Sequence, residues 1–553
     1  MLRILLGRAR TGKSARVLEE IRALGDSSQQ ILLVPEHASH VAEVDVCRAC
    51  GVTASRHAEV LTFKLLASRV LTLTGGAAEV TLDNGGKLLL LQRVLVSLAP
   101  SLRVYRRPSQ RAAFLESLLA LIEELQAYAV APEVLAEKAE AIAGESGERL
   151  RDVALLYGAY LAKLHEGGRD ARDRLEKLEE NLAASGYADN KDIFLDGFSY
   201  FTGRERNILR ILLKRAKSVT VTLLGDGSDS ELFAEGLRVR EQLYALARDA
   251  GVPCTEEVLR GGAPRDALGH VEKHFFGGNV RWDEPTEQLR LYEASTAYDE
   301  AERIAAEILR LVRCEGYRFR DITVTSRDMD AAEPVLRTVF ARCGIPLYCA
   351  RRSDILRRGV PALLLGALDA VSGGFEYEDV FRCLKTGLAG LSAEECDLLE
   401  NYVIKWDIRG AMWTRDVPWT AHPEGYGVPW RTEHEEMLAR VNAAREKVRA
   451  PLSHLYEGVR GMGDVEGKVT TLYNYLTEIA LPEELQRQTE TLWQRGETQR
   501  AEELAQLWNV LCGVLDQFVE MLGGTELDAE EFARLMRLVL TQYSVGTIPV
   551  SLD

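Results

Sequence analysis

The sequence lacks paired cysteines, long apolar runs and an excess of positive charge. Its nine cysteines are scattered over 553 residues, which is typical of reduced thiols in a large protein rather than of a disulfide framework. No run of about 18 apolar residues is present, so no membrane-spanning helix is expected. The first apolar run stops at Gly7 and is too short for a secretory leader. We therefore expect a cytoplasmic protein without a membrane partner.

The net charge is −16 at pH 7, which argues against a broadly basic surface for nucleic acid. It still permits a local basic channel, or a channel to which a partner contributes the positive charge. A chain of this length exceeds what one hydrophobic core supports, so two to four domains are expected.

A phosphate-binding pattern is present close to the first residue. The segment "RILLGRARTGKSARVLEEI" holds Gly7, four residues, and then Gly12-Lys13-Ser14 between a strand-like run and a helix-like run. A P-loop requires this order, because its backbone N–H groups wrap the phosphates just before a helix begins. Lys13 would reach the β- and γ-phosphates of ATP, and Ser14 would hold Mg²⁺. The predicted loop comprises Gly7, Arg8, Ala9, Arg10, Thr11, Gly12, Lys13 and Ser14.

A second acidic partner for the nucleotide is expected at the end of another strand. "IFLDGF" places Asp196 after an apolar run, where it could share Mg²⁺ with Ser14. Gly197 follows, whereas active P-loop helicases usually have Glu there to orient the attacking water. Asp226, at the end of "VTVTLLGD", has no nearby glutamine that could sense the γ-phosphate. The pattern favours nucleotide binding without fast hydrolysis, and an ordinary turn role for both aspartates is the alternative.

The order of apolar runs indicates an α/β fold with two parallel-sheet domains, each interrupted by helices. In the first half, strands are expected at 2–7, at 31–35, at "DIFLDGF" and at "SVTVTLLGD", and "AEVLTF" is a strand that runs into a helix. A helical stretch covers about 85 to 185. In the second half, strands are expected at "LRLYEAS", "DITVTSRD" and "GIPLY", and helices follow.

The expected domain boundaries follow from this order, with glycine-rich breaks near 260–288. The last residues look like the entry to another strand, so we expect the chain to be a fragment of a longer one. The expected parts are a first α/β domain at 1–85 and 186–265 with a helical insertion at 86–185, a second α/β domain at 286–375 with a helical insertion at 376–543, and the start of a continuation at 544–553.

A family resemblance becomes specific when the segments are taken in order. The chain contains, in sequence, "GRARTGKS", "ILLVPEHAS", "VLTFKLLASRVL", "FLDGFSYFTGRERNIL", "YDEAERIAAEILRLV", "GYRFRDITVTSRD", "GIPLY" and "VFRCLKTGL". Together these segments resemble the AddB subunits of bacterial AddAB helicase–nucleases, from the first residues to the last. The resemblance implies two RecA-like P-loop domains of the superfamily 1 helicase type, with ATP and Mg²⁺ bound at the first.

The resemblance also implies a divided role in the repair of DNA double-strand breaks. In the family, AddA is the motor subunit of the heterodimer, and the AddB core guides the 3′-ended strand and scans it for Chi. A C-terminal nuclease domain, with a 4Fe–4S cluster and its own Mg²⁺, supplies 5′→3′ cleavage, and it is not recognisable in these 553 residues. Arg10 departs from the family, which commonly has glycine there, and a side chain would strain a position that requires positive φ.

The resemblance places candidate contacts with single-stranded DNA after three strands of the first domain. One of them, "TFK", offers a hydroxyl, a stacking ring and a cation, although Phe63 could equally be a core residue. Arg327 occupies the position at which helicases place an arginine near the γ-phosphate, or else it forms a salt bridge with Asp328 or another neighbour. The DNA candidates are Glu36, His37, Ser39, Thr62, Phe63, Lys64, Tyr200 and Phe201.

Residues 402–430 hold four of the seven tryptophans. Lys405, Arg409 and Arg415 are interleaved with them, so these rings could stack on bases. They could also anchor a loop-rich part of the second insertion, which is the interpretation that we favour.

Two short patterns have structural interpretations. Cys47 and Cys50 form a C-x-x-C without a second pair at zinc spacing, so they are expected to be structural thiols on a helix. His37 and His40 have no carboxylate or thiol grouping beside them, and no metal site is expected there.

Three functions compete at this stage. The first is a DNA-repair subunit that works with AddA on duplex ends and single strands, with nuclease activity only in a missing part. The second is an autonomous superfamily 1 ATPase or helicase, which would require Glu after Asp196 and Gln after Asp226. The third is a non-catalytic scaffold that binds single-stranded DNA and its motor partner, and the acidic charge of the chain fits it. We favour the first.

Overall fold

The computed structural model describes residues 1–51, 53–75, 82–106, 112–166, 174–228, 231–261, 266–275, 280–349, 353–354, 356 and 358–545. The chain divides into two compact units, Met1–Thr81 with Ser117–Leu291, and Leu82–Glu116 with Tyr292–Asp553. The first unit contains a parallel sheet, and the second is mainly helical. This division differs from the expected domains at 82–116, which group with the second unit.

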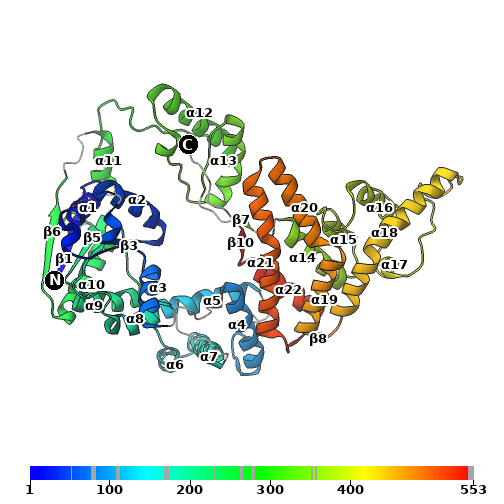
Figure 1. The fold of residues 1–553 in the computed structure, drawn as a ribbon, viewed down its shortest axis with the longest axis horizontal. Coiled ribbons are helices and arrows are strands. Elements are labelled where there is room, and N and C mark those ends of the chain that lie inside the picture. The colour runs from blue at the N-terminus through cyan, green and yellow to red at the C-terminus, as the bar shows by residue number, and fades with distance from the viewer. Residues whose placement is uncertain are drawn as a thin grey trace. The chain divides into compact units, whose positions relative to one another are not determined.

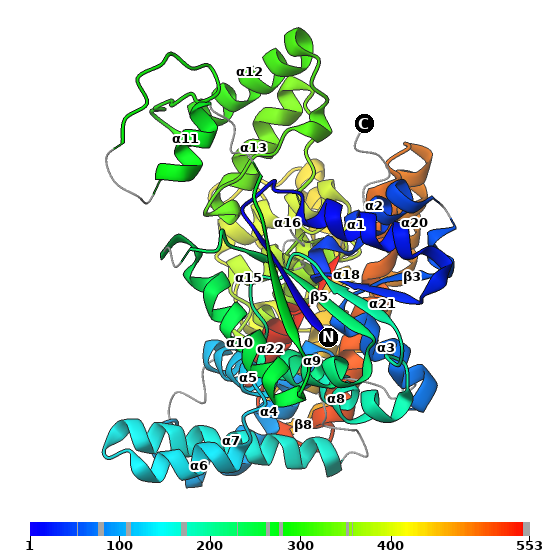
Figure 2. The same ribbon diagram turned by 90° about the vertical axis from the view of Figure 1, so that its left-hand side faces the viewer.

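A six-stranded, fully parallel sheet forms the centre of the first unit (Figures 1 and 2). The strand order is β3-β2-β4-β5-β1-β6, so β5 separates β1 from β4. Because the strands are parallel, their carboxyl ends share one edge of the sheet, where ligands bind in open α/β sheets. The strands are β1 (Leu2–Gly7), β2 (Gln30–Leu33), β3 (Ala58–Leu61), β4 (Asp192–Leu195), β5 (Ser218–Leu224) and β6 (Cys254–Leu259).

Helices cover both faces of this sheet, which explains why its inner strands are continuous apolar runs rather than alternating ones. On one face, Leu5 and Phe194 pack with Val17 and Ile21 of the helix after β1. On the other face, apolar residues of four helices form the larger core. The first face carries α1 (Lys13–Leu24) and α2 (Ser39–Cys50), and the second carries α3 (Phe63–Thr74), α8 (Arg174–Ser185), α9 (Gly203–Arg215) and α10 (Ala234–Ala250).

The helical stretch expected between about 85 and 185 is present. Its helices are α4 (Asn84–Leu98), α5 (Ala112–Ala127), α6 (Pro132–Ala141), α7 (Glu145–Glu166) and α8, and α11 (Ala267–His274) follows β6. Helix starts follow local capping chemistry. Thr202 and Glu205 form a capping box at α9, and Asp83 accepts a hydrogen bond from Gly86 N–H at α4.

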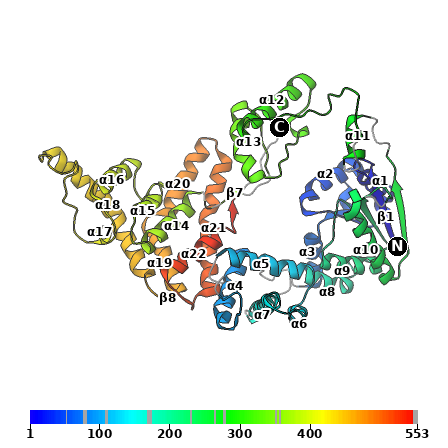
Figure 3. The ribbon, with the colours of Figure 1, turned by 180° about the vertical axis from the view of Figure 1, so that it is seen from behind.

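The second unit is a set of packed helices. Among the described residues its longest helix is α18, which lies beside α19 (Figure 3). The helices are α12 (Ala297–Glu315), α13 (Met329–Cys343), α14 (Gly359–Ser372), α15 (Tyr377–Leu384), α16 (Ala393–Trp406), α17 (Ala411–Thr414), α18 (Thr432–Val459), α19 (Val465–Glu478), α20 (Leu481–Gln494), α21 (Thr498–Leu522) and α22 (Ala529–Leu540). The helical character expected after about 375 is therefore present.

A second parallel sheet is not confirmed. The segments expected as strands at 289–295, 322–326 and 345–348 have no strand pairing within the described part of the chain. Ile322, Val324 and Ile345 still pack with α12 and α13, whereas Leu291 is 98% exposed. Apolar runs with high strand propensity predicted strands here, but a strand also requires a neighbour for its ladder.

Short two-residue strands are present in the second unit. β7 (Ser353–Asp354) pairs antiparallel with β10 (Ser544–Val545), and β8 (Gly463–Asp464) with β9 (Glu526–Leu527). The rest of the expected continuation, from 546 to 553, lies outside the described residues.

Candidate nucleotide-binding site

The glycine–lysine–serine loop connects the carboxyl end of β1 to the first turn of α1. Gly12 adopts φ 85° just before the helix, and no side chain caps the helix start. The N–H groups of the first turn therefore remain available to an anion, and the positive end of the helix dipole lies at the same place. Ser14, the expected Mg²⁺ ligand, is exposed in this first turn.

Gly7 is required by close packing inside the loop. A Cβ atom at this position would lie 2.2 Å from Thr11 Oγ1. The same hydroxyl donates a 2.9 Å hydrogen bond to the carbonyl oxygen of Arg8. The hydrogen bond holds the loop curled over the end of β1, and the absence of a side chain at Gly7 leaves room for Thr11.

Lys13 is folded back onto the loop that precedes it. Its Nζ donates hydrogen bonds of 2.7 Å to the carbonyl oxygens of both Gly7 and Arg8. Burial lowers the pKa of the Lys13 amine, and the nearby carboxylate of Asp196 opposes this effect. The ammonium group is thus held over the loop by weak neutral acceptors, which a phosphate oxygen could replace with a charge-assisted hydrogen bond.

Arg10 adopts φ 60°, in the left-handed region that favours glycine. The expectation that this position requires positive φ is confirmed. A left-handed conformation costs a residue other than glycine about 1–2 kcal/mol, so the loop stores local strain at the residue that departs from the family pattern.

Asp196 lies directly after β4, at the sheet edge where the loop also begins. Thr222, on the neighbouring strand β5, donates a 2.5 Å hydrogen bond to Asp196 Oδ1. The electrostatic effect of Asp196 on Lys13 shows that the two charged groups influence each other. The structure therefore brings the predicted acidic partner to the predicted loop, with one strand between them.

Gly197 occupies the position at which a hydrolytic glutamate would stand. Its φ is 83°, a conformation that strains any residue with a side chain. The local backbone thus disfavours glutamate at this position, in addition to the sequence lacking it.

Arg8 and Asp226 form a contact that sequence reasoning missed. Arg8 Nη2 lies 2.8 Å from Asp226 Oδ2, and the guanidinium group stacks over the ring of Phe233 at 5.4 Å. Burial alone would raise the pKa of Asp226, but hydrogen bonds from Ser228 and the ion pair with Arg8 lower this pKa to about 2. Asp226 thus positions the loop through Arg8. The sequence indicated that Asp226 lies at a strand end near the site, but it did not indicate that Arg8 is the partner of Asp226.

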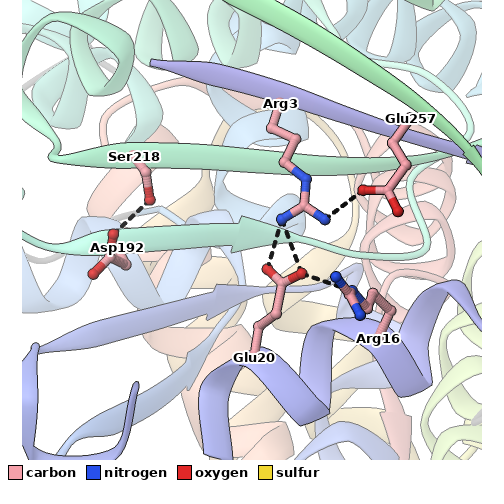
Figure 4. A network of polar contacts seen from close by, with 6 residues as sticks. All are labelled: Arg3, Arg16, Glu20, Asp192, Ser218 and Glu257. Atoms are coloured by element: carbon pink, nitrogen blue, oxygen red, sulfur yellow. Dashed lines mark hydrogen bonds and ion pairs between the residues drawn. The ribbon is translucent and has the colours of Figure 1, made fainter. Parts of the chain in front are cut away.

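A second missed contact fixes the P-loop helix on the sheet (Figure 4). Arg3 of β1 bonds Glu20 of α1 at 2.8 Å and Glu257 of β6 at 2.7 Å, and Arg16 also bonds Glu20. The guanidinium group therefore ties α1 to two strands, which sets the direction of the helix start.

The candidates after β2 and β3 divide into exposed and buried side chains. Glu36 and His37 are exposed, and Lys64 Nζ lies 3.6 Å from Glu36 Oε2. Ser39 is half-buried at the start of α2. The Thr62 hydroxyl is buried and accepts a hydrogen bond from Leu65 N–H as the cap of α3. Glu36, His37 and Lys64 therefore remain accessible, whereas Thr62 is used by the fold.

The aromatic candidates are mostly core residues. Phe63 is 5% exposed, and its ring meets Phe198 edge-on at 5.6 Å. Phe201 is also buried and packs against Phe198 at 5.1 Å. The assignment of Phe63 and Phe201 as stacking platforms is corrected on this ground, because a ring enclosed by apolar side chains presents no face to a base. Tyr200 is 65% exposed, so its ring remains a candidate for stacking on DNA bases.

Arg327 belongs to the second unit and is exposed just before α13. In the described part of the chain it forms no ion pair. Asp328, its suggested partner, instead accepts a hydrogen bond from Ala331 N–H as the cap of α13. A role for Arg327 near a γ-phosphate stays a prediction.

The tryptophan-rich segment is anchored within the second unit. Trp413 is 1% exposed, and Trp419 stacks on Tyr402 at 5.3 Å and packs beneath Arg445. Lys405 donates a 2.8 Å hydrogen bond to the carbonyl oxygen of Pro423. The packing supports the anchoring interpretation over base stacking.

The remaining patterns are also placed. Cys47 and Cys50 lie on α2 as free thiols. Among the residues that the structure describes, no group of three or more His, Cys, Asp or Glu side chains could hold a metal ion. None of the described helices is both long and apolar enough to cross a bilayer.

A parallel sheet with this loop after β1 and an aspartate after β4 is compatible with the RecA-like fold of P-loop proteins. Residues 4–272 match the family model described as "ADDB, N-terminal". The chain belongs to the AddB family, as its N-terminal part.

Relatives over the whole chain agree with this assignment. The chain is 31% identical to an ATP-dependent helicase/deoxyribonuclease subunit of Acetivibrio thermocellus, and it covers 50% of that protein. It is also 31% identical to the equivalently named protein of Caldanaerobacter subterraneus and 30% identical to that of Thermoanaerobacter pseudethanolicus, with 49% of each covered. The chain spans about half the length of these curated relatives.

Proposed function

We propose that this chain is the helicase-like part of the AddB-type subunit of an ATP-dependent helicase/deoxyribonuclease that processes DNA double-strand breaks for recombinational repair. Its partner is an AddA-type motor subunit, and its substrates are duplex ends and the single strands produced from them. The proposal rests on the family assignment, and the whole-protein activity comes from the names of relatives twice as long.

The observation that carries the proposed role is the combination of a built phosphate loop with a missing hydrolytic group. Lys13 and Asp196 provide a cation for phosphates and a carboxylate for Mg²⁺. Gly197, at φ 83°, provides no base to orient water. We infer that the core binds Mg-ATP and hydrolyses it slowly, so that AddA supplies the motive force.

A core that does not drive translocation by ATP hydrolysis can still guide DNA. We propose that the 3′-ended strand passes the carboxyl edge of the sheet, where Lys64 and Tyr200 are exposed. A cation and a free ring at one edge suit phosphate contact and base stacking. Scanning for Chi is assigned to this path by resemblance to the family.

The nuclease is assigned to the part of the relatives that this chain does not span. By resemblance, that part would hold the 4Fe–4S cluster and the nuclease Mg²⁺, with 5′→3′ polarity. A cytoplasmic location is proposed on the same basis.

A non-catalytic DNA-binding scaffold is the second candidate. The observation that favours it is the strain at Arg10 together with the retracted Lys13, since both oppose tight binding of ATP.

The test measures Mg-ATP binding and hydrolysis by this chain, with and without single-stranded DNA. We expect binding that Lys13→Ala weakens about tenfold or more, the loss of one charge-assisted contact, while Lys214→Ala, an exposed lysine on α9, leaves it unchanged. Hydrolysis should stay well below the about 1 s⁻¹ of slow ordinary enzymes. DNA-stimulated turnover above that rate would instead show an autonomous ATPase, and absence of any ATP binding would support the scaffold.

A further inference from the structure

The second unit contains a cavity of about 580 Å³ between the start of α14 and the hairpin of α20 and α21. Its volume lies in the range of small-ligand sites. Arginine dominates its charged lining: Arg358, Arg487, Arg495 and Arg500 face Glu497 and Glu503. The lining residues therefore carry a net charge of +2, although the chain as a whole carries −16.

The arginines that line the cavity differ in whether they form an ion pair and in how exposed that ion pair is. Arg358 lies 2.6 Å from Glu503, a carboxylate that is mostly buried. Arg487 and Arg500 pair with Glu484 and Glu497 one helical turn away, and their side chains are mostly exposed. Such exposed pairs contribute little and are easily exchanged for another anion.

Arg495 stands at the turn between α20 and α21, where Gly496 adopts φ 76°. Its backbone N–H caps α20, but its guanidinium group has no ion pair in the part of the chain that the structure describes. An exposed arginine that lines a basic cavity and has no carboxylate partner offers a planar set of donors that matches a phosphate.

The first turn of α14 borders the same cavity. Arg358 precedes the helix in an extended conformation without a side-chain cap, and Gly359 lines the cavity. Pro361 contributes no N–H, and Val360 is buried away from the cavity lining, so the N–H of Gly359 is the donor that this turn could offer. Helix N-terminus and arginines therefore favour the same kind of ligand, an oxyanion.

We propose that this cavity binds phosphate groups, and that its ligand is the backbone of single-stranded DNA. The exposed arginines Arg487, Arg495 and Arg500 can follow an extended polyanion, whereas a compact phosphate would contact fewer of them. The choice of DNA rests on the proposed function, in which the protein handles single strands. The chemistry of the cavity also fits a free di- or triphosphate, and the experiment separates the two sources.

The experiment compares the full chain with an Arg487→Glu/Arg495→Glu variant. A matched control, Arg440→Glu/Arg460→Glu, makes the same charge change at two exposed arginines, one on α18 and one directly after it. Binding of a labelled oligo(dT) is measured over a range of salt concentrations, and binding of inorganic pyrophosphate is measured separately. Thermal unfolding checks that each variant folds. Arg495→Gln is a milder variant, because Arg495 forms no ion pair among the described residues and its replacement should not disturb the fold.

We expect the cavity variant to bind oligo(dT) about tenfold or more weakly than the control, with a salt slope reduced by about 1.4, or about 0.7 for each lost phosphate contact. Loss of pyrophosphate binding with unchanged DNA binding would keep the phosphate site and overturn DNA as its ligand. Equal behaviour of cavity and control variants toward both probes would overturn the proposal.

The proposed function fails separately from this inference. Lys13→Ala tests the nucleotide loop in the first unit, and it should leave oligo(dT) binding by the cavity unchanged. A chain that binds no ATP yet distinguishes cavity from control variants would refute the proposed nucleotide role and retain the phosphate site.

Discussion

Thr222 and Asp196 stand on adjacent parallel strands, and the Thr222 hydroxyl donates a 2.5 Å hydrogen bond to Asp196 Oδ1. The hydroxyl orients the carboxylate that is expected to meet Mg²⁺. Thr222→Val should weaken Mg-ATP binding several-fold and lower the free energy of unfolding by about 1–2 kcal/mol, because the hydroxyl also accepts a 3.4 Å hydrogen bond from Gly197 N–H. Binding is measured by titration calorimetry with Mg²⁺ and with EDTA.

The control for this change is Thr220→Val, the same substitution two residues earlier on β5 at another buried threonine. An equal loss of Mg-ATP binding in both variants would show a general effect on the sheet and would contradict the orienting role of Thr222.

The ion pair between Arg8 and Asp226 predicts a pH dependence. The pKa of Asp226 is lowered to about 2 in the folded protein, whereas an unfolded aspartate titrates near 3.9. The stabilisation is therefore complete above about pH 4 and is lost as the pH falls toward 2. Because both side chains are partly exposed, Asp226→Asn should cost only about 0.5–1 kcal/mol at pH 7, measured by urea unfolding.

The difference between the wild-type chain and Asp226→Asn should shrink between pH 4 and pH 3. A difference that stays constant over this range would mean that the carboxylate charge is not the source of the stabilisation.

Strain at Arg10 predicts that Arg10→Gly stabilises the loop. Relief of the strained left-handed conformation raises the free energy of unfolding by about 1–2 kcal/mol. The greater flexibility of glycine in the unfolded chain lowers it by about 0.5–1 kcal/mol. A net gain of about 0.5–1 kcal/mol is expected in denaturant unfolding, together with tighter ATP binding. Arg10→Ala, which keeps a Cβ, should give neither effect; equal gains in both variants would rule out strain as the cause.

Burial separates Phe63 from Tyr200. Phe63→Ala should destabilise the first unit by about 3–5 kcal/mol, as expected for a large core side chain. Tyr200→Ala should leave stability within about 0.5 kcal/mol and weaken binding of single-stranded DNA. Thermal unfolding and oligonucleotide binding are measured on both variants. A stable Phe63→Ala chain with weakened DNA binding would restore the ring as a base platform.

Sequence patterns predicted the first sheet well because its inner strands are buried on both faces and read as apolar runs. β6 was not predicted. Its sequence, "CTEEVL", contains Glu256 and Glu257, which lower strand propensity. At the edge of the sheet these charges are tolerated, because Glu257 bonds Arg3 and Glu256 bonds Tyr244. The partner of Glu257 lies far away in sequence and leaves no local signal.

The site shows the same division between local and long-range information. Gly12 and Lys13 follow from local spacing, the positive φ at Arg10 was expected from the resemblance to the family, and Asp196 follows from its place after a strand. The Arg8–Asp226 pair spans more than two hundred residues and could not be derived from spacing. Phe63, for which the sequence left both a core role and a stacking role open, is buried by tertiary packing, which the local motif could not reveal.

The most direct test of the account is DNA unwinding by the heterodimer of the full-length AddB-type protein and its AddA-type partner, with Lys13→Ala placed in this chain. Because Gly197 leaves the core without a hydrolytic glutamate, unwinding should proceed at close to the wild-type rate even though the variant binds ATP poorly. Loss of unwinding on Lys13→Ala, with heterodimer formation intact, would show that this core is itself a motor and would contradict the account.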